Sequence, residues 1–123
     1  MKVFDFESSK IVGSFSDIHK GPIRIVKQIL DTNRILTGSL DKTAVLLDYN
    51  TSQLLTTFHH PSPIKDIAIH PSGFNFAIVG GPEMTIYDIR KSSKPLFEVK
   101  RCHFEGVTQV QYMSTGDRVI TTG

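Results

Sequence analysis

Residues 36–43 read Leu-Thr-Gly-Ser-Leu-Asp-Lys-Thr, and the apolar run that follows them ends at Leu47-Asp48. The segment Leu40-Asp41-Lys42 is typical of a tight turn, because an aspartate side chain can bond the backbone a short way along the chain. The flanking residues are mostly aliphatic or β-branched, which favours strands. This part of the chain therefore predicts two short strands joined by a turn.

The surroundings of this hairpin recur along the chain. One landmark is a histidine followed four residues later by a β-branched apolar residue, with a spacing of roughly 40 residues. These histidines are His19, His60 and His103. A second landmark, an aspartate that closes a short apolar run, recurs with a similar period at Asp5, Asp48 and Asp88. Two independent landmarks that share one period predict tandem structural repeats.

Strands rather than helices fill each period. Apolar and polar residues alternate in the segments 64–69 and 107–112, as in half-buried strands. Residues typical of turns separate the apolar runs, at 31–33, 40–42, 70–73, 80–82 and 114–117. We expect short strands joined by tight turns, four to a period, and no helix, which makes the fold class all-β.

A histidine, then the segment 36–43, then an apolar residue followed by aspartate resembles the WD40 repeat of β-propellers. The resemblance covers nearly the whole chain and implies blades, each of them a four-stranded antiparallel sheet. Where the family usually has Trp-Asp, this chain has Phe-Asp, Leu-Asp and Tyr-Asp, which accounts for a propeller sequence without tryptophan.

The resemblance further implies a hydrogen-bonded tetrad in each blade. His19, Thr37 and Asp41 occupy three of its positions, and Leu47 occupies the position where the family usually has tryptophan. Because leucine has no N–H to donate, this network is one member short, at a cost of about 0.5–1.5 kcal/mol per lost bond.

The tetrads of the following repeats are expected to be less complete. His60 and His103 occupy the histidine position in them. In the second repeat Ile78 replaces the hydroxyl residue, and the turn 79–83 is one residue shorter and contains no aspartate.

The expected strands divide the chain into four segments. Residues 1–15 supply the last two strands of a blade, 16–58 and 59–100 two complete blades, and 101–123 the first two strands of a further blade. Since a closed ring needs about four to eight blades, we interpret the chain as three blades' worth of an incomplete, seven-bladed ring. Chains that assemble a ring between them are the alternative. Open blade faces predict that the isolated chain self-associates or aggregates.

Composition and charge narrow the possible classes of function. The 123 residues are 39% hydrophobic and 21% charged, as in an ordinary globular domain. No apolar run reaches the roughly 18 residues of a membrane span, and residues 1–5 lack the apolar segment of a signal peptide. The net charge of +2 is too small to indicate nucleic-acid binding by itself. Cys102, the single cysteine, suits a reducing compartment. We therefore expect an intracellular protein without a membrane partner.

The histidines and the cysteine do not predict a metal site or a catalytic site. The repeat already explains His19, His60 and His103, and the side chains of the adjacent His59 and His60 diverge on an extended chain. No CxxC or HxxxH spacing is present. Cys102 and His103 also face opposite ways, and no acid is placed to orient the histidine. We expect no catalytic residue, metal, cofactor or small-molecule substrate, and hence no enzyme.

A basic run in the second half of the chain has two interpretations. Its residues are Arg90, Lys91, Lys94, Lys100 and Arg101. They could contact phosphates, with the aromatic ring of Phe104 available for base stacking. The plainer interpretation is the solvated outermost strand of a blade, where lysines also deter pairing with another edge.

The segment Tyr87-Asp88-Ile89-Arg90 resembles the box by which some propellers dock on cullin ligase adaptors, with Tyr in place of Trp. The resemblance implies an adaptor contact through Tyr87, Asp88 and Arg90. Coincidence within an ordinary repeat is the alternative.

WD40 propellers generally act as rigid interaction platforms, and this resemblance implies partners at the loops beside the histidines and the aspartate turns. The candidate loop residues are Asp17, Lys20, Lys42, Ser62, Pro82, Glu83, Arg101 and Phe104.

Within the WD40 family, the chain most resembles the UTP-fifteen subfamily of the small-subunit processome. The segments that carry this resemblance are 2–5, 36–41, 70–73 and the shortened turn at 79–81. It implies a non-catalytic scaffold in ribosome biogenesis and pre-rRNA processing, in the nucleolus, with other proteins and pre-ribosomal RNA as partners. Two alternatives stay open: a substrate receptor on a cullin-RING ligase adaptor, and a generic WD40 interaction platform in the cytoplasm or nucleus.

Overall fold

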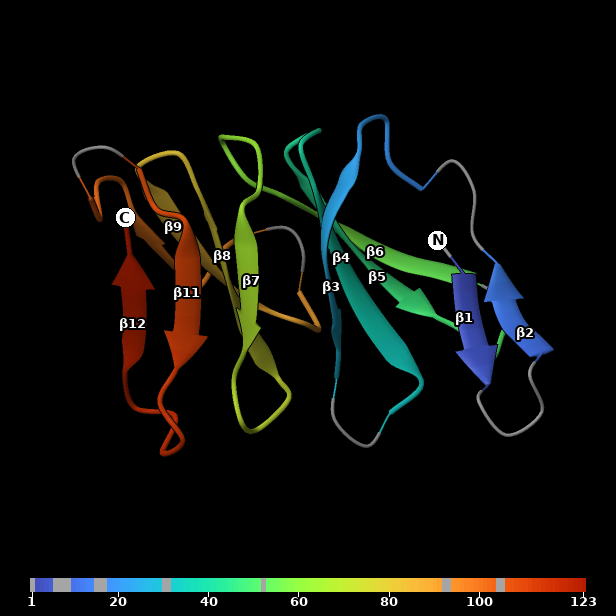
Figure 1. Cartoon of the computed structure of the whole chain (residues 1–123). Coiled ribbons are helices and arrows are strands. Elements are labelled where there is room, and N and C mark those ends of the chain that lie inside the picture. Colours follow the sequence, from blue (N-terminus) through green and yellow to red (C-terminus); the bar gives the residue numbers. More distant parts are fainter. Residues whose placement is uncertain are drawn as a thin grey trace.

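The computed structural model describes residues 2–5, 10–14, 18–29, 32–51, 53–91, 94–103 and 106–123. Every regular element within these ranges is a strand, and the strands form antiparallel sheets that lie in a row (Figure 1). The all-β prediction is therefore confirmed. Among the described residues, no helix is long and apolar enough to cross a membrane.

Two four-stranded sheets form the middle of the molecule. The first has the order β3 (Ile23–Gln28), β4 (Arg34–Ser39), β5 (Thr43–Asp48) and β6 (Gln53–His59). The second contains β7 (Asp66–Ile69), β8 (Asn75–Gly80), β9 (Glu83–Asp88) and β10 (Phe97–Val99), again with neighbours in space adjacent in sequence. Each sheet is thus a simple up-and-down meander, the architecture expected of a WD40 blade.

A two-stranded sheet lies on each side of this pair. These sheets consist of β1 (Lys2–Asp5) with β2 (Lys10–Ser14), and β11 (Gln109–Tyr112) with β12 (Val119–Thr122). In Figure 1 the strands β3, β7 and β11, which open their sheets, stand side by side at the front. The sheets are therefore stacked with corresponding strands next to one another.

Burial changes from one strand to the next in a way that explains the sequence pattern. In β4 every residue except Arg34 is buried, and β8 is buried from Phe76 to Gly80. These strands lie in the middle of a sheet that is covered on both faces, so they are continuously apolar rather than alternating. The outer strands β6 and β10 are largely exposed.

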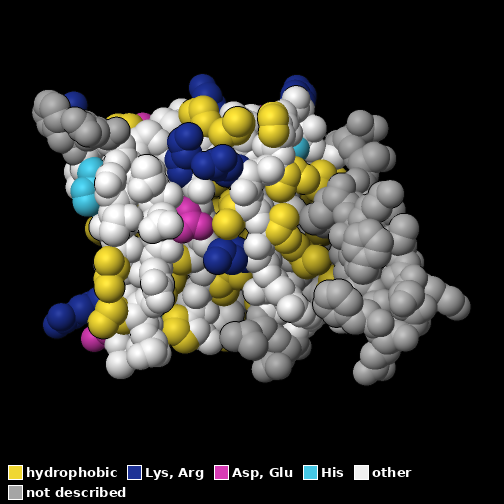
Figure 2. Space-filling view, in the orientation of Figure 1, with side chains coloured by type: hydrophobic (Ala, Val, Ile, Leu, Met, Phe, Trp, Pro, Cys, Tyr) yellow, Lys and Arg dark blue, Asp and Glu magenta, His cyan; other side chains and the backbone are white. Residues whose placement is uncertain are grey.

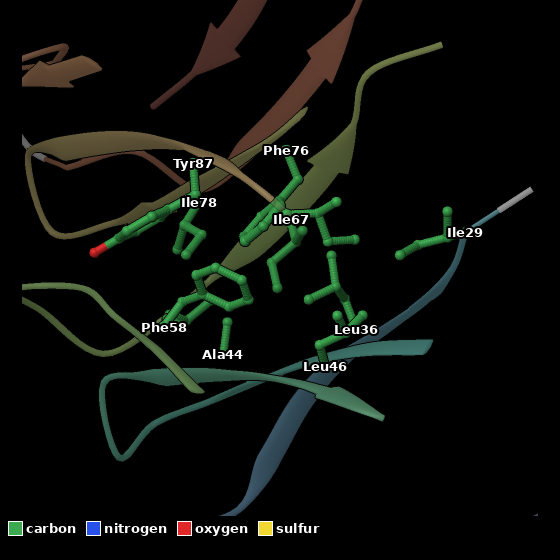
Figure 3. Close-up of a cluster of buried hydrophobic side chains, with 11 residues drawn as sticks. Ile29, Leu36, Ala44, Leu46, Phe58, Ile67, Phe76, Ile78 and Tyr87 are labelled. Atoms are coloured by element: carbon green, nitrogen blue, oxygen red, sulfur yellow. The ribbon is translucent and has the colours of Figure 1, made fainter. Parts of the chain in front are cut away.

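The main hydrophobic core lies between the two four-stranded sheets (Figure 3). Its centre is Phe58 from the first sheet, whose ring centroid lies 4.8 Å from that of Phe76 and 5.1 Å from that of Tyr87. The cluster also includes the buried side chains of Ile29, Leu36, Ala44, Leu46, Ile64, Ile67, Ile78 and Ile89. A smaller cluster around Val79 and Val110 joins the second sheet to β11 and β12.

Strands β7 and β11 begin two residues later than the alternation at 64–69 and 107–112 predicts. The reason is that the preceding residues pair with the sheet before them. The Ile64 N–H donates to the Ser39 carbonyl at 3.0 Å, and the Val107 N–H donates to the Gly81 carbonyl at 2.6 Å. The chain therefore links consecutive sheets by hydrogen bonds before it enters the next one.

A glycine makes this close approach possible in the second sheet. A Cβ atom placed on Gly80 would lie 2.1 Å from the carbonyl oxygen of Pro63, which belongs to the link between the two sheets. Because the obstacle is backbone, a side chain could be accommodated only by moving the link. The close approach of the link to β8 thus requires a residue without a side chain here.

Candidate interaction surface

One end of the stacked sheets, the upper end in Figure 1, contains the β4–β5 and β8–β9 turns and the links between sheets. We call it the turn end. Backbone hydrogen bonds connect consecutive repeats at this end. The His60 N–H donates to the Lys42 carbonyl at 2.9 Å, and the Cys102 N–H donates to the Pro82 carbonyl at 2.7 Å. Each link therefore lies against the turn of the sheet before it, and the loops form a fixed surface.

In the first sheet, the side chain of His19 anchors the turn. Its Nε2 lies 2.7 Å from the hydroxyl oxygen of Thr37, and its Nδ1 lies 3.1 Å from the carboxylate of Asp41. The structure therefore brings together the three side chains that the resemblance places in a tetrad. Since a carboxylate can only accept, Nδ1 of His19 carries a proton and donates it to Asp41.

Thr43 is a further member of this network that the sequence analysis missed. Its hydroxyl lies 3.0 Å from Nδ1 of His19 and donates to Asp41 at 2.5 Å, and its N–H donates to the same carboxylate at 2.9 Å. The signal was available, because an aspartate in a turn commonly bonds the backbone two residues further on.

The Asp41 carboxylate is the centre of the turn. Partial burial alone would raise its pKa, but the hydrogen bonds from the Thr43 hydroxyl and from the N–H groups of Lys20 and Thr43, with the nearby His19, outweigh it. Together they lower the pKa of Asp41 from 3.8 to about 2. The carboxylate is therefore ionised at every physiological pH and holds both sides of the turn.

The second sheet anchors its turn with different partners. His60 is buried, its Nε2 lies 3.0 Å from the Gly80 carbonyl, and its Nδ1 lies 2.9 Å from the hydroxyl of Thr85. Burial lowers the pKa of His60, which keeps the ring neutral. Since a carbonyl can only accept, Nε2 carries the proton and the Thr85 hydroxyl donates to Nδ1. The ring is thus fully hydrogen-bonded without an aspartate.

The strand register shows how the second sheet replaces the missing hydroxyl. Thr37 on β4 faces Val45 on β5, whereas at the equivalent pair Ile78 on β8 faces Thr85 on β9. In the first sheet the hydroxyl residue of this cross-strand pair lies on β4, and in the second sheet it lies on β9, the other strand of the pair. Side chains directly opposite each other on a sheet lie within contact, so the histidine finds a partner on either strand.

This exchange predicts coupling between Ile78 and Thr85. We expect Thr85→Val to lower the free energy of unfolding by about 1–3 kcal/mol, because Nδ1 of the buried His60 loses its donor. Adding Ile78→Thr should recover part of this loss by returning a hydroxyl to the position it has in the first sheet. Urea unfolding of both single variants and the double variant would measure the coupling, at about 1 kcal/mol.

Thr85→Ser is the matched control, since it keeps the hydroxyl and should lose much less stability than Thr85→Val. Strict additivity of the two substitutions would show that the two positions do not serve the same histidine.

The third repeat returns to the first arrangement. Nε2 of His103 lies 2.9 Å from the hydroxyl of Thr121, which faces Val110 across the β11–β12 ladder as Thr37 faces Val26. Thr121 follows His103 by 18 residues, as Thr37 follows His19. The period of the repeat therefore contained the signal that identifies Thr121.

The family's tryptophan position differs between the two full sheets. Leu47 is fully buried and packs with Val45 on the face toward Ile18 and Tyr49. Tyr87 packs against Phe58 in the main core, and its hydroxyl donates to the His59 carbonyl at 2.9 Å. Burial raises the pKa of Tyr87, so this donor is retained, and it fixes the link just before His60.

The candidate loop residues lie at the turn end but are not equally accessible. Lys20, Lys42 and Arg101 are exposed, whereas Pro82 and the pair Ser62 and Glu83 are partly buried. The Ser62 hydroxyl donates to the Glu83 carboxylate at 3.1 Å. Asp17 and Phe104 lie outside the described residues.

The basic run divides between the two ends of the second sheet. Lys100 and Arg101 follow β10 at the turn end, where Cys102 bonds Pro82. Arg90 and Lys91 follow β9 at the opposite end, and Lys94 precedes β10. Because β9 and β10 are antiparallel, residues close in sequence are carried to opposite ends. The run is therefore not one continuous stripe.

The segment that resembles the adaptor box contains side chains with structural contacts. Tyr87 is in the core, and Asp88 is 9% exposed and accepts bonds from Nε and Nη2 of Arg90 at 3.0 and 2.8 Å. These bonds lower the pKa of Asp88 to about 2. Arg90 is the exposed member, and adaptor docking through this segment stays a prediction.

A groove lies on the face formed by β3, β7 and β11, the face turned to the viewer in Figures 1 and 2. It has a volume of about 500 Å3 and runs between β3, β7 and the β11–β12 sheet. Figure 2 shows basic and acidic side chains among hydrophobic ones on this face. The acid lining the groove, Asp66, accepts from the Val110 N–H at 3.0 Å and so links two sheets.

In the part of the chain that the structure describes, no three His, Cys, Asp or Glu side chains are grouped so that they could hold a metal ion. Every buried side-chain nitrogen or oxygen there also has a hydrogen-bond partner.

Comparison with known proteins gives relatives of two kinds. Pre-mRNA-processing factor 19 of Mus musculus is 32% identical over 93 residues, which are 75% of this chain and 18% of that protein. The U3 small nucleolar RNA-associated protein 15 homolog of Bos taurus is 29% identical over 92 residues, again 75% and 18% of the two chains. The homolog of Gallus gallus is 27% identical over 120 residues, 97% of this chain and 23% of that protein.

The chain thus spans about a fifth of the length of the curated relatives it matches. No family model matches it. At about 30% identity, and with blades of WD40 type, the chain is a distant homologue of two kinds of WD40-repeat protein, pre-mRNA-processing factor 19 and U3 small nucleolar RNA-associated protein 15, which these identities do not separate.

Proposed function

We propose that the protein is a non-catalytic WD40 scaffold of a nuclear RNA-processing assembly, and specifically of the small-subunit processome in ribosome biogenesis. The observation that carries the scaffold function is the turn end, where His19, His60 and His103 are hydrogen-bonded within their own blades and the links at His60 and Cys102 are bonded to the turns before them. Rigid backbone with exposed side chains of varied chemistry is what a platform for several partners requires.

The names of the relatives support an RNA-processing assembly. One kind is associated with U3 small nucleolar RNA and the other with the processing of pre-mRNA. The extent of the alignments does not separate the two kinds, since it reaches 97% of the chain for the U3-associated homolog of Gallus gallus and 98% for pre-mRNA-processing factor 19 of Caenorhabditis elegans. The choice of the processome and a nucleolar location rests on the resemblance of segments 2–5, 36–41, 70–73 and 79–81. The higher identity of the second kind, 32%, keeps a pre-mRNA-processing assembly as the second candidate.

Substitutions at the turn end test whether that end is the platform. We expect Lys20→Ala with Lys42→Gly to reduce the amount of partner protein that co-purifies with the tagged protein from its own cells. Glycine suits position 42, because Lys42 has a φ of 73°, in the left-handed region that glycine adopts without strain. Quantitative mass spectrometry of the eluted proteins would measure the reduction.

Arg34→Ala with Arg118→Ala is the matched control. It also removes two exposed cations, but from the start of β4 and from the residue before β12, at the end of the sheets opposite the turn end. Equal losses in the two double variants, or no loss in either, would contradict the assignment of the platform to the turn end.

A further inference from the structure

A second exposed feature lies at the end of the second sheet opposite the turn end. It consists of Phe74, Arg90, Lys91 and Lys94, and we call it the Phe74 corner. Phe74 precedes β8 and is 52% exposed, and its carbonyl accepts from the Ile89 N–H at 2.8 Å, which places it beside the residues that follow β9. A large aromatic ring is thus left half in solvent at the end of the sheet where Arg90, Lys91 and Lys94 lie.

The guanidinium group of Arg90 lies over the Phe74 ring, with its central carbon 4.8 Å from the ring centroid. Three hydrogen bonds to the Asp88 carboxylate fix its position: from Nε at 3.0 Å, from Nη2 at 2.8 Å and from the Arg90 N–H at 2.9 Å. The side chain is nevertheless 63% exposed. The guanidinium group therefore has a ring on one side and is held in place with much of the Arg90 side chain in solvent.

The charges of the corner are only partly compensated. Asp88 neutralises Arg90, so this pair offers a planar surface rather than a free charge. Lys91 is exposed and bridges to the Asp88 backbone, and Lys94 is exposed before β10. No ion pair of either lysine occurs among the residues the structure describes. The corner thus combines a stacking surface with two cations that are free to meet negative charge.

We propose that the Phe74 corner binds single-stranded RNA. A base stacks on the outer face of the Arg90 guanidinium, which Phe74 supports from below, and the flanking phosphates meet Lys91 and Lys94. Unpaired bases commonly stack on arginine planes and aromatic rings, and lysines follow the backbone. An acidic peptide would match the lysines but would leave the planar surface unused, so the combination favours a nucleic acid.

The proposal deepens the proposed function, since it names RNA as a direct partner of the scaffold, but its test does not depend on which assembly the protein joins. The purified protein is titrated into a fluorescently labelled, unstructured 12-nucleotide RNA, and binding is followed by fluorescence anisotropy. Binding at the corner predicts that Arg90→Lys weakens affinity by about 5-fold or more, because the charge remains while the planar surface is lost.

The lysines are tested by the salt dependence of binding. For Lys91→Ala with Lys94→Ala, we expect the slope of log K against log salt to become shallower by about 1.4, since each phosphate contact on a single strand contributes about 0.7. Arg90→Lys should leave that slope nearly unchanged. Arg24→Ala with Lys65→Ala removes the same charge from elsewhere on the surface and should leave both affinity and slope as they are.

Equal effects of the control and the lysine variant would show non-specific attraction and would overturn the proposal, as would unchanged affinity in Arg90→Lys. Binding of an acidic peptide of equal length, with no binding of RNA, would overturn it in favour of a protein partner. Loss of RNA binding in the corner variants with co-purifying proteins retained would separate this inference from the platform at the turn end.

Discussion

Replacing Phe58 by alanine is expected to lower the free energy of unfolding by about 3–5 kcal/mol. The side chain is fully buried between the two four-stranded sheets and contacts the rings of Phe76 and Tyr87. Removing it leaves a cavity where the two sheets meet, and the aromatic contacts on the opposite sheet are lost with it. Urea unfolding, followed by circular dichroism, would measure the loss.

Phe74→Ala is the matched control for this prediction. Phe74 is 52% exposed and lies outside the core clusters, so the same change should lower the free energy of unfolding by less than about 1 kcal/mol. A loss for Phe58→Ala as small as that of the control would contradict the packing of the two sheets as one body.

Asp41→Ala should have the second-largest effect, a loss of about 2 kcal/mol of unfolding free energy. The carboxylate accepts hydrogen bonds from the Lys20 N–H and the Thr43 N–H, both at 2.9 Å, from the Thr43 hydroxyl and from His19. Hydrogen bonds to a charged group contribute about 1.5–3 kcal/mol each when buried, and solvent at the turn reduces their sum. Urea unfolding at pH 7 would measure the loss.

The same network predicts a dependence on pH. Since the pKa of Asp41 falls from 3.8 to about 2 on folding, its ionised form stabilises the fold fully above pH 4. That contribution is lost as the pH falls through 2. In Asp41→Asn the rise in stability between pH 2 and pH 4 should be smaller than in the wild type. It should not vanish, because Asp88 has a similarly lowered pKa.

Asp117→Ala provides the comparison for Asp41. Asp117 is exposed and accepts a hydrogen bond from the neighbouring Thr115, so its removal should change stability by no more than about 0.5 kcal/mol. A pH profile for Asp41→Asn identical to that of the wild type would show that the turn does not depend on the carboxylate.

The blades could be predicted from the sequence because their landmarks are local and periodic. The segment 36–43 contains the turn and the hydroxyl residue of one blade, and the histidines recur ahead of each sheet. The period survives substitution at individual positions. It therefore indicated strands, turns and anchoring histidines without any knowledge of how the sheets pack.

The partners of His60 could not be predicted in the same way. The family pattern places the hydroxyl at position 78, but here it lies on Thr85, opposite Ile78 in the neighbouring strand. Whether two residues face each other depends on the register of the β8–β9 hairpin, and the shortened turn changes their spacing along the chain. The other partner of His60 is the Gly80 carbonyl. Because every residue has a backbone carbonyl, the sequence does not show which one the histidine bonds.

For the basic run, the prediction of one continuous stripe was wrong, because residues that are close in sequence lie far apart in the folded sheet. The chain reverses direction between β9 and β10, so Arg90 and Lys100 lie at different ends of the sheet. The contact of Arg90 with Phe74 spans two strands and has no sequence signal. Long-range contacts of this kind depend on the finished sheet.

The most direct test of membership in an RNA-processing assembly is to purify the tagged protein from its own cells, with and without ribonuclease, and to identify both its RNA and its proteins. We expect enrichment of U3 small nucleolar RNA and pre-ribosomal RNA, with ribosome-assembly proteins at near-equal amounts. Enrichment of pre-mRNA instead would move the protein to the second candidate assembly. A cullin ligase adaptor as the main partner, with no enriched RNA, would contradict membership in either RNA-processing assembly.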